Sequence, residues 1–257
     1  MLTTIIVCFL AGMGAGLGTG FAGMSAAAVI TPMLITFLDI PAYDAVGIAL
    51  ASDVLASAVS AFTYGKNKNL DVKNGIVMML TVLCFTMIGS FVASKVPNHA
   101  MGNASVIMTF FLGIKFIVKP IMTTKENMNA KDPKKMLIGS IVGGTLVGFI
   151  CGFIGAGGGM MMLLVLTSIL GYELKTTVGT SVFIMAFTAL TGSLSHFAIG
   201  GVPDALVLVL CIGFTFLWAR IASVFANKAS AKVLNRTVGV VLTVLGAAIL
   251  FVNYVMN

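Results

Sequence analysis

Charged side chains are scarce in this sequence. Only 9% of its 257 residues are Asp, Glu, Lys or Arg, and 59% are hydrophobic, whereas soluble domains carry about 25% charged residues. This composition excludes a water-soluble globular protein. Apolar runs near the ~20 residues that a helix needs to cross a bilayer follow one another along the chain. We therefore predict an all-α, polytopic helical membrane protein that lies in the lipid bilayer.

The signatures of several other protein classes are also missing. There is no GxxxxGK[ST] phosphate loop and no polar stretch longer than 119–135, so we expect no ATP-driven pump and no cofactor. The cysteines lack metal-ligand spacing, which predicts no metal site. Basic residues stand singly in short loops, which argues against nucleic acid as a partner. No facing Ser/His or paired-carboxylate arrangement is evident, so we expect no enzyme.

Apolar runs between glycine and proline breakers predict ten helical segments. The second and seventh have only about 15 and 13 residues, or roughly 20 Å of helix, against a hydrocarbon core of about 30 Å. We expect these two segments to be broken or re-entrant helices. The ten ranges are 2–22, 24–38, 42–64, 74–94, 103–118, 136–155, 158–170, 176–198, 205–225 and 234–255.

Basic residues gather on one side of this predicted topology. The positive-inside rule makes that side cytoplasmic, so the linker is expected inside and both termini outside a plasma membrane. Lys95 is the one basic residue expected outside. Most of the others fall after the third segment, in the linker and after the ninth segment: Lys66, Lys68, Lys73, Lys119, Lys125, Lys131, Lys134, Lys135, Lys228, Lys232 and Arg236.

The second half of the sequence repeats the first at a shift of 132 residues. Ten identities, five of them glycines, align without a gap, from Ile6 with Ile138 to Gly47 with Gly179. Such an excess indicates a duplication. Because the charges orient the halves oppositely, we predict two inverted-topology repeats, 1–120 and 136–257, joined by a cytoplasmic linker at 121–135.

Two kinds of glycine pattern recur in both halves. Glycines spaced four apart (12, 16 and 20; 144, 148 and 152) favour close helix packing. The glycine turns Gly20–Ser25 and Gly152–Gly159 precede the short segments, where freed N–H groups at helix N-termini favour an anion. The alternative is that these turns are only hinges. The predicted substrate-binding residues are Gly23, Met24, Ser25, Gly155, Ala156, Gly157, Gly158, Gly159, Thr180 and Ser181.

With these motifs the sequence resembles the TauE/SafE family of sulfite and organosulfonate transporters. The resemblance depends on the two glycine turns, on Thr177-Val-Gly-Thr-Ser181, and on the Asn69-Leu-Asp71 and Val202-Pro-Asp204 connections. It implies a permease for small sulfur-containing anions such as sulfite or sulfonates. The first turn has Met24-Ser25 where the second has Ala156-Gly157, so its backbone site is less well formed.

Three polar residues inside predicted segments are candidates for coupling or gating. Asp53 lies near the middle of the third segment, where an ionised carboxylate costs at least about 2.5 kcal/mol; it is either a coupling residue or a hydrogen-bonded structural acid. Arg220 is close enough to a helix end to reach the interface or to contact an anion. His196 and its repeat partner Tyr64 are expected to anchor at the interface.

Several functions remain open at this stage. A secondary carrier that exports a small anion is favoured, because an inside-negative potential expels anions. Asp53 is the feature that argues instead for proton- or cation-coupled transport, including of carboxylates. An intramembrane enzyme and a purely structural membrane subunit are the alternatives from other classes. A second copy of the chain is a further candidate partner.

Overall fold

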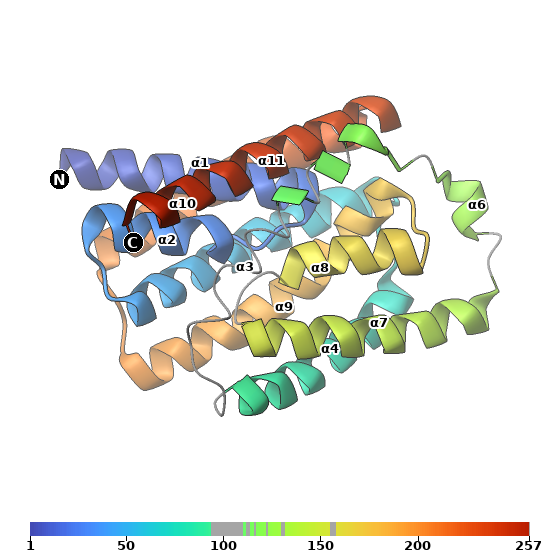
Figure 1. Cartoon of the computed structure of the whole chain (residues 1–257), viewed down its shortest axis with the longest axis horizontal. Helices are drawn as coiled ribbons and strands as arrows, with labels where there is room; N and C mark the ends of the chain where they lie inside the picture. Colours follow the sequence, from blue (N-terminus) through green and yellow to red (C-terminus); the bar gives the residue numbers. More distant parts are fainter. Residues whose placement is uncertain are drawn as a thin grey trace.

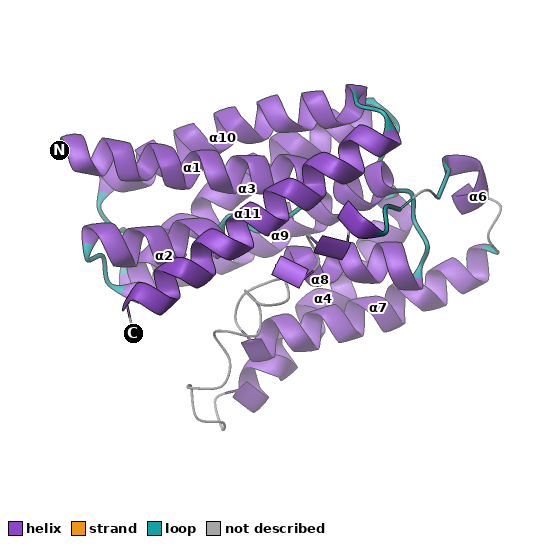
Figure 2. Ribbon diagram, turned by 45° about the horizontal axis from the view of Figure 1, so that its top comes forward, coloured by secondary structure: helices purple, strands orange, loops and turns teal. Residues whose placement is uncertain are grey.

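The protein folds as a bundle of helices. The structure is a computed structural model that describes residues 1–93, 110–111, 114–115, 117–121, 123–129, 132–154 and 158–256. Within these ranges every regular element is a helix (Figure 2). The predicted all-α class is therefore confirmed.

The helices follow the predicted segments closely. The short helix α6 was not expected, and α7 begins at Pro133, three residues before the predicted start, because Asp132 caps it by accepting the Lys134 N–H at 3.0 Å. Most of the predicted segment 103–118 lies outside the described residues. The elements are α1 Leu2–Ala22, α2 Ala27–Leu38, α3 Ala42–Lys66, α4 Val72–Ala93, α6 Lys125–Asn129, α7 Pro133–Ile154, α8 Gly158–Leu164, the π-helix η2 Val165–Ile169, α9 Leu174–Gly200, α10 Ala205–Lys228 and α11 Ala231–Met256.

Helix lengths separate full spans from half-spans. Six helices of the described chain are long and apolar enough to cross a membrane, namely α1, α3, α7, α9, α10 and α11. The 12 residues of α2 are too few, and so are the seven of α8 with the five of η2, since 12 residues make about 18 Å of helix. The expectation that neither short segment spans the membrane alone is met.

The helices pack in pairs that cross the two halves of the sequence. α1 lies along α10, α4 along α7, and α3 along α9 (Figure 1). α1 and α7 run in opposite directions in that view, and both termini lie at the end opposite α6. Asp39 after α2 and Gly171 after η2, which align at the repeat shift, both adopt positive φ. These features fit the inverted repeat, which stays a prediction.

The spaced glycines hold these pairs together. A Cβ atom added at Gly12, Gly16 or Gly20 would lie 2.5–2.6 Å from atoms of α10. One at Gly148 would lie 2.5 Å from the Val82 carbonyl oxygen of α4, and one at Gly144 would collide with Thr81. The packing interpretation is confirmed for these five glycines, because only a residue without a side chain allows such close approach. The packing of Gly152, the third glycine of the second ladder, lies outside what the structure describes.

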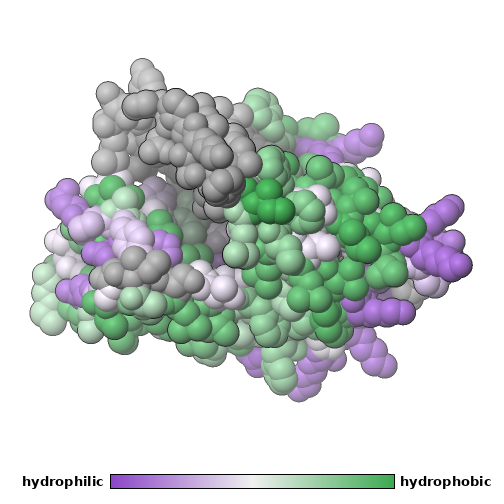
Figure 3. Space-filling view, turned by 90° about the horizontal axis from the view of Figure 1, so that it is seen from below, coloured by the Kyte–Doolittle hydropathy of each residue, from purple (hydrophilic) through white to green (hydrophobic). Residues whose placement is uncertain are grey.

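Side chains on the outside of the bundle are mainly apolar. Phe62, Leu194 and Val209 are among many large hydrophobic residues that are more than half exposed. In Figure 3 strongly hydrophilic residues lie at both ends of the molecule, with more of them at the end that holds α6 in Figure 1. An apolar belt with a charged end is the distribution expected of a chain in a bilayer.

Candidate functional site

The first glycine turn ends α1 and leads into α2. Gly23 adopts φ +61°, and its N–H donates to the Thr19 carbonyl at 2.9 Å. That left-handed conformation favours glycine. The Met24 N–H donates to Gly18, and its carbonyl accepts the Thr19 hydroxyl at 2.8 Å. Both backbone groups of Met24 are therefore used within the turn, and its side chain is fully buried.

The second glycine turn meets the first inside the bundle. Gly159, near the start of α8, lies so close that an added Cβ would collide with the Gly23 carbonyl oxygen and would lie 2.9 Å from the Ser25 nitrogen. Gly158 is partly buried beside it. Gly155, Ala156 and Gly157 lie outside the described residues. Two turns 136 positions apart in the chain thus share one contact, as a common site between them requires.

α9 contributes one of its two predicted residues to this contact. The Ser181 hydroxyl donates to the Gly23 carbonyl at 3.0 Å and is fully buried. Thr180 points elsewhere: its hydroxyl accepts the Asp71 N–H at 3.1 Å, at the start of α4. Successive helix residues face about 100° apart, so only one of the two can face the turns.

Asp53 of α3 lies next to the first turn. Its carboxylate accepts the Ser25 hydroxyl and the Ser57 hydroxyl, each at 2.8 Å, and its side chain is 1% exposed. The Ser25 oxygen in turn accepts the Ala27 N–H at 3.3 Å, which ties the carboxylate to the start of α2. The expectation that Asp53 faces protein rather than lipid is met. The site therefore holds a buried acid beside the place where the two turns meet.

Ser57 was missed by the sequence analysis. It stands four residues after Asp53, on the same face of α3, and a serine at that spacing from an acid in an apolar helix was the available signal. Ser60 continues this face and is also fully buried. The polar face of α3 is therefore longer than the single acid suggested.

Tyr64 does not lie at the interface as expected. It is fully buried, and its hydroxyl donates to the Gly20 carbonyl at 2.9 Å. The prediction was wrong because it used only the position near a helix end. A buried Tyr hydroxyl normally has a hydrogen-bond partner, and here the acceptor is a carbonyl near the end of α1.

His196 and Arg220 lie apart from the glycine turns. The His196 ring stacks on Tyr43, with ring centroids 4.3 Å apart. Its Nδ1 is buried and has no hydrogen-bond partner among the described residues. Arg220 is exposed, and its guanidinium donates to the Thr63 hydroxyl at 3.1 Å, ten residues along α3 from Asp53. Neither side chain contacts the residues of the first turn.

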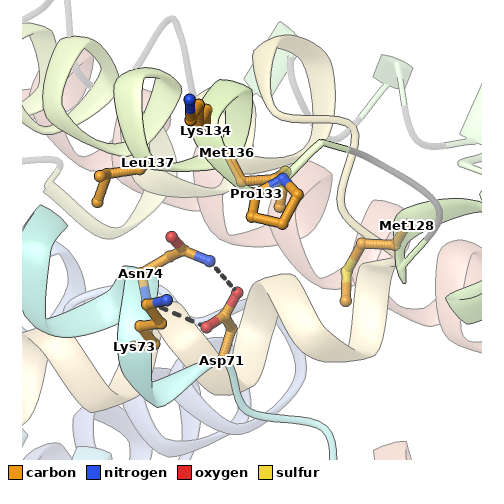
Figure 4. A pocket seen from close by; sticks show the side chains of 8 residues that line it. All are labelled: Asp71, Lys73, Asn74, Met128, Pro133, Lys134, Met136 and Leu137. Atoms are coloured by element: carbon orange, nitrogen blue, oxygen red, sulfur yellow. Dashed lines mark hydrogen bonds between the residues drawn. The ribbon is translucent and has the colours of Figure 1, made fainter.

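A cavity opens at the lysine-rich end of the bundle, where Lys73 and Lys134 are among the residues that line it. It has a volume of about 320 Å³ between the starts of α4 and α7, beside α6 (Figure 4). Asp71 caps α4 by accepting the Asn74 N–H at 3.1 Å and also accepts the Tyr172 hydroxyl at 2.8 Å. Burial, together with the nearby Asp71 carboxylate, raises the pKa of the Tyr172 hydroxyl, so this group stays protonated and donates.

The chemistry available at the turns is that of hydroxyls, peptide groups and one carboxylate. Among the described residues no three His, Cys, Asp or Glu side chains gather in a way that could hold a metal ion. Serine hydroxyls and peptide N–H groups bind anion oxygens without introducing a fixed positive charge. Groups of these kinds can hold the oxygen atoms of a small solute by hydrogen bonds.

Comparison with known proteins places the whole chain in one family. The chain is 24% identical to the "Probable membrane transporter protein YunE" of Bacillus subtilis (strain 168), over 96% of this chain and 98% of that protein. It is 27% identical to the "Probable membrane transporter protein MJ0441" of Methanocaldococcus jannaschii, over 94% and 92%. No solved structure matches significantly. The family model described as "Sulfite exporter TauE/SafE" matches residues 8–249, so the chain belongs to the TauE/SafE family.

Proposed function

We propose that this chain is a secondary membrane transporter of small sulfur-containing anions such as sulfite or organosulfonates. Family membership and the transporter names of its relatives support the general activity. The observation that carries the proposal is the contact between the two glycine turns, where Gly159 lies against Gly23 and Ser25. This contact brings peptide groups and hydroxyls together in the interior.

The anion would bind beside Ser25 and Gly159. The peptide groups of Gly23 and Met24 are engaged within their own turn or with Ser181, so the first turn offers mainly Ser25. Glycines at the start of α8 allow an anion to approach the backbone closely. The uneven site then has the turn with the more glycine-rich sequence on one side and a hydroxyl on the other.

Alternating access would come from movement of one packed unit against another. The half-helices α2 and α8–η2 start inside the bundle, so small movements of them would open the site toward one end or the other. The glycine ladders make the pairs α1–α10 and α4–α7 the natural rigid units. In a plasma membrane with the α6 end in the cytoplasm, an inside-negative potential would favour export of an anion that moves without a coupling ion.

The proposal is tested by flux into liposomes that contain the purified protein. Sulfite and several sulfonates are offered, and a carboxylate such as acetate tests the rival substrate class. We expect saturable flux of at least one sulfur anion and competition among the sulfur anions. Flux of acetate alone, or no flux of any anion, would contradict the proposal.

A glycine variant locates the site. Gly159→Ala places a methyl group against the Gly23 carbonyl, so we expect at least a tenfold loss of sulfur-anion flux. Gly213→Ala is the matched control, because nothing lies within 4 Å of a Cβ added at that helical glycine. It should carry the anion at the wild-type rate. Equal rates for the two variants would place the site elsewhere.

A further inference from the structure

A buried acid next to a proposed anion site needs an explanation. α1 and α2 carry no charged side chain over Leu2–Ala22 and Ala27–Leu38. Asp53 is therefore the ionisable side chain beside the first turn. We propose that Asp53 takes up one proton when the anion binds at the glycine turns, so that anion and proton cross the membrane together. This inference rests on the proposed function, because it assigns a coupling ion to the same site.

Repulsion between two negative charges links the two events. Ser25 hydrogen-bonds the Asp53 carboxylate at 2.8 Å and lies against Gly159 through its nitrogen. An anion held at Ser25 and Gly159 would therefore be a close neighbour of the carboxylate in a region of low dielectric. Like charges this close in a buried site do not both stay ionised. A sulfonate keeps its charge, so the proton goes to Asp53.

Among the residues that the structure describes, no other charged side chain stands beside Asp53 to offset a bound anion. On α10, Arg220 contacts α3 at Thr63, about 15 Å along the helix from Asp53. On α9, His196 meets α3 at Tyr43 and near Gly47, at least about 9 Å away in the other direction.

The remaining basic and acidic groups of these elements lie at the helix ends. Lys175 and Lys228 lie at the lysine-rich end, where the Lys175 ammonium donates to the Asn227 carbonyl. Asp44 is in the first turn of α3. Protonation is therefore the remaining way in which the described residues can neutralise the site.

A proton would approach this buried carboxylate along the polar face of α3. Asp53, Ser57, Ser60 and Tyr64 follow at a spacing of four, three and four residues, which keeps them on one side of the helix. The Ser60 hydroxyl is fully buried and has no hydrogen-bond partner among the described residues. The face leads from Asp53 toward the lysine-rich end of the bundle.

The surroundings of Asp53 suit a proton. Both of its oxygens already pair with hydroxyls at 2.8 Å. A hydroxyl accepts as readily as it donates, so a protonated Asp53 can keep both partners by donating to one of them. A metal cation would instead have to displace these donors and gather further oxygen ligands.

Anion binding measured against pH tests the inference. The probe is methanesulfonate, which stays a monoanion throughout, and its Kd is measured between about pH 5 and pH 8. For wild type we expect Kd to rise with pH, approaching tenfold per unit once the acid is ionised. For Asp53→Asn we expect a Kd that does not change with pH. Asp39→Asn, which alters an exposed acid at the end of α2, should keep the wild-type dependence.

Membrane potential gives a second measurement. A monoanion that moves with a proton carries no net charge, so wild-type methanesulfonate accumulation in liposomes should not respond to a potassium diffusion potential set with valinomycin. Asp53→Asn should carry charge, with an accumulation that changes about fiftyfold per 100 mV. If that variant does not fold, release or uptake of protons on anion binding to wild type decides the matter, with one proton expected per anion.

Three results would overturn the inference while leaving the proposed function intact. They are a wild-type Kd that is flat with pH, an Asp53→Asn protein whose Kd still depends on pH, and accumulation that requires sodium in place of a pH gradient. Absence of binding and flux for every sulfur anion at every pH would instead reject the proposed function itself.

Discussion

Individual hydrogen bonds make the site asymmetric. In the first turn the Gly23 and Met24 peptide groups are taken up by Thr19, Gly18 and Ser181. In the proposed site a solute would therefore meet the Ser25 hydroxyl there, and Ser25 is already paired with an acid. Binding an anion must change this pair, which is why the solute and the charge state of Asp53 are expected to be linked.

Tyr172 joins the end of η2 to the start of α4. Because its hydroxyl donates to the Asp71 carboxylate at 2.8 Å and the side chain is fully buried, Tyr172→Phe should lower the free energy of unfolding by about 1.5–3 kcal/mol. Thermal unfolding in detergent measures this. Tyr43→Phe removes an exposed hydroxyl that donates at 3.4 Å and should change stability far less. An equal loss of stability in the two variants would show that the hydrogen bond to Asp71 stabilises the fold no more than the exposed one.

The residues of the site were only partly predictable from the sequence. The pattern of a glycine-rich turn before a short apolar segment predicted Gly23, Ser25 and Gly159 as candidate site residues. The pairing of Ser25 with Asp53 could not be foreseen, because it joins different helices and depends on how they pack. Thr180 and Ser181 show the same limit, since neighbouring residues of one helix face different partners.

Among the helices, the short ones matter most for the proposed mechanism. α2 and α8–η2 start inside the bundle and cannot cross a bilayer alone. Each follows a long helix whose spaced glycines pack against a helix from the other half of the sequence. Pairs of long helices that stay rigid, each leading into a short helix, could hold the proposed binding site while one side of the bundle opens.

The glycine ladders can be tested in matched variants. Gly16→Val in α1 and Gly144→Val in α7 place branched side chains against α10 and α4, and each should destabilise the fold by about 1–3 kcal/mol or more. Gly213→Val adds the same side chain to α10 with nothing within 4 Å, so it reports the change in helix propensity alone. Unfolding temperatures in detergent compare the three. A loss for Gly213→Val as large as the other two would refute the packing role.

Helix positions were more predictable than helix ends. Apolar runs between breakers found most helices because a membrane helix needs an unbroken apolar length. The observed helix ends differ from the predicted ones by a few residues where the helix extends beyond the apolar run. α7, for example, includes Pro133 and Lys134 because Asp132 caps it. α6 was missed because only one of its five residues, Met128, is apolar, so the segment shows no apolar period.

For the molecule as a whole, the direction of each half is the main structural expectation. α2 and η2 finish at opposite ends of the bundle (Figure 1), and the residues that follow them, Asp39 and Gly171, share a left-handed backbone. The termini lie together, away from α6. These placements agree with the topology that the lysines predict.

Cysteine labelling of intact cells tests this topology. In a chain with its four cysteines replaced, Asp39→Cys should react with a membrane-impermeant maleimide from outside. Glu173→Cys should react only after permeabilisation, because the inverted repeat puts the ends of α2 and η2 on opposite faces. Labelling of both positions from the same side would contradict the inverted arrangement.

The central claim is that the meeting point of the two glycine turns is a solute site open to each side in turn. Ser25→Cys in the cysteine-free protein tests it most directly, through its rate of reaction with a small impermeant thiol reagent applied to either face of oriented vesicles. With alternating access, the introduced cysteine should react from both faces, and a transported sulfonate should slow the reaction in each case. Reaction from one face only, at a rate that no sulfur anion changes, would contradict it.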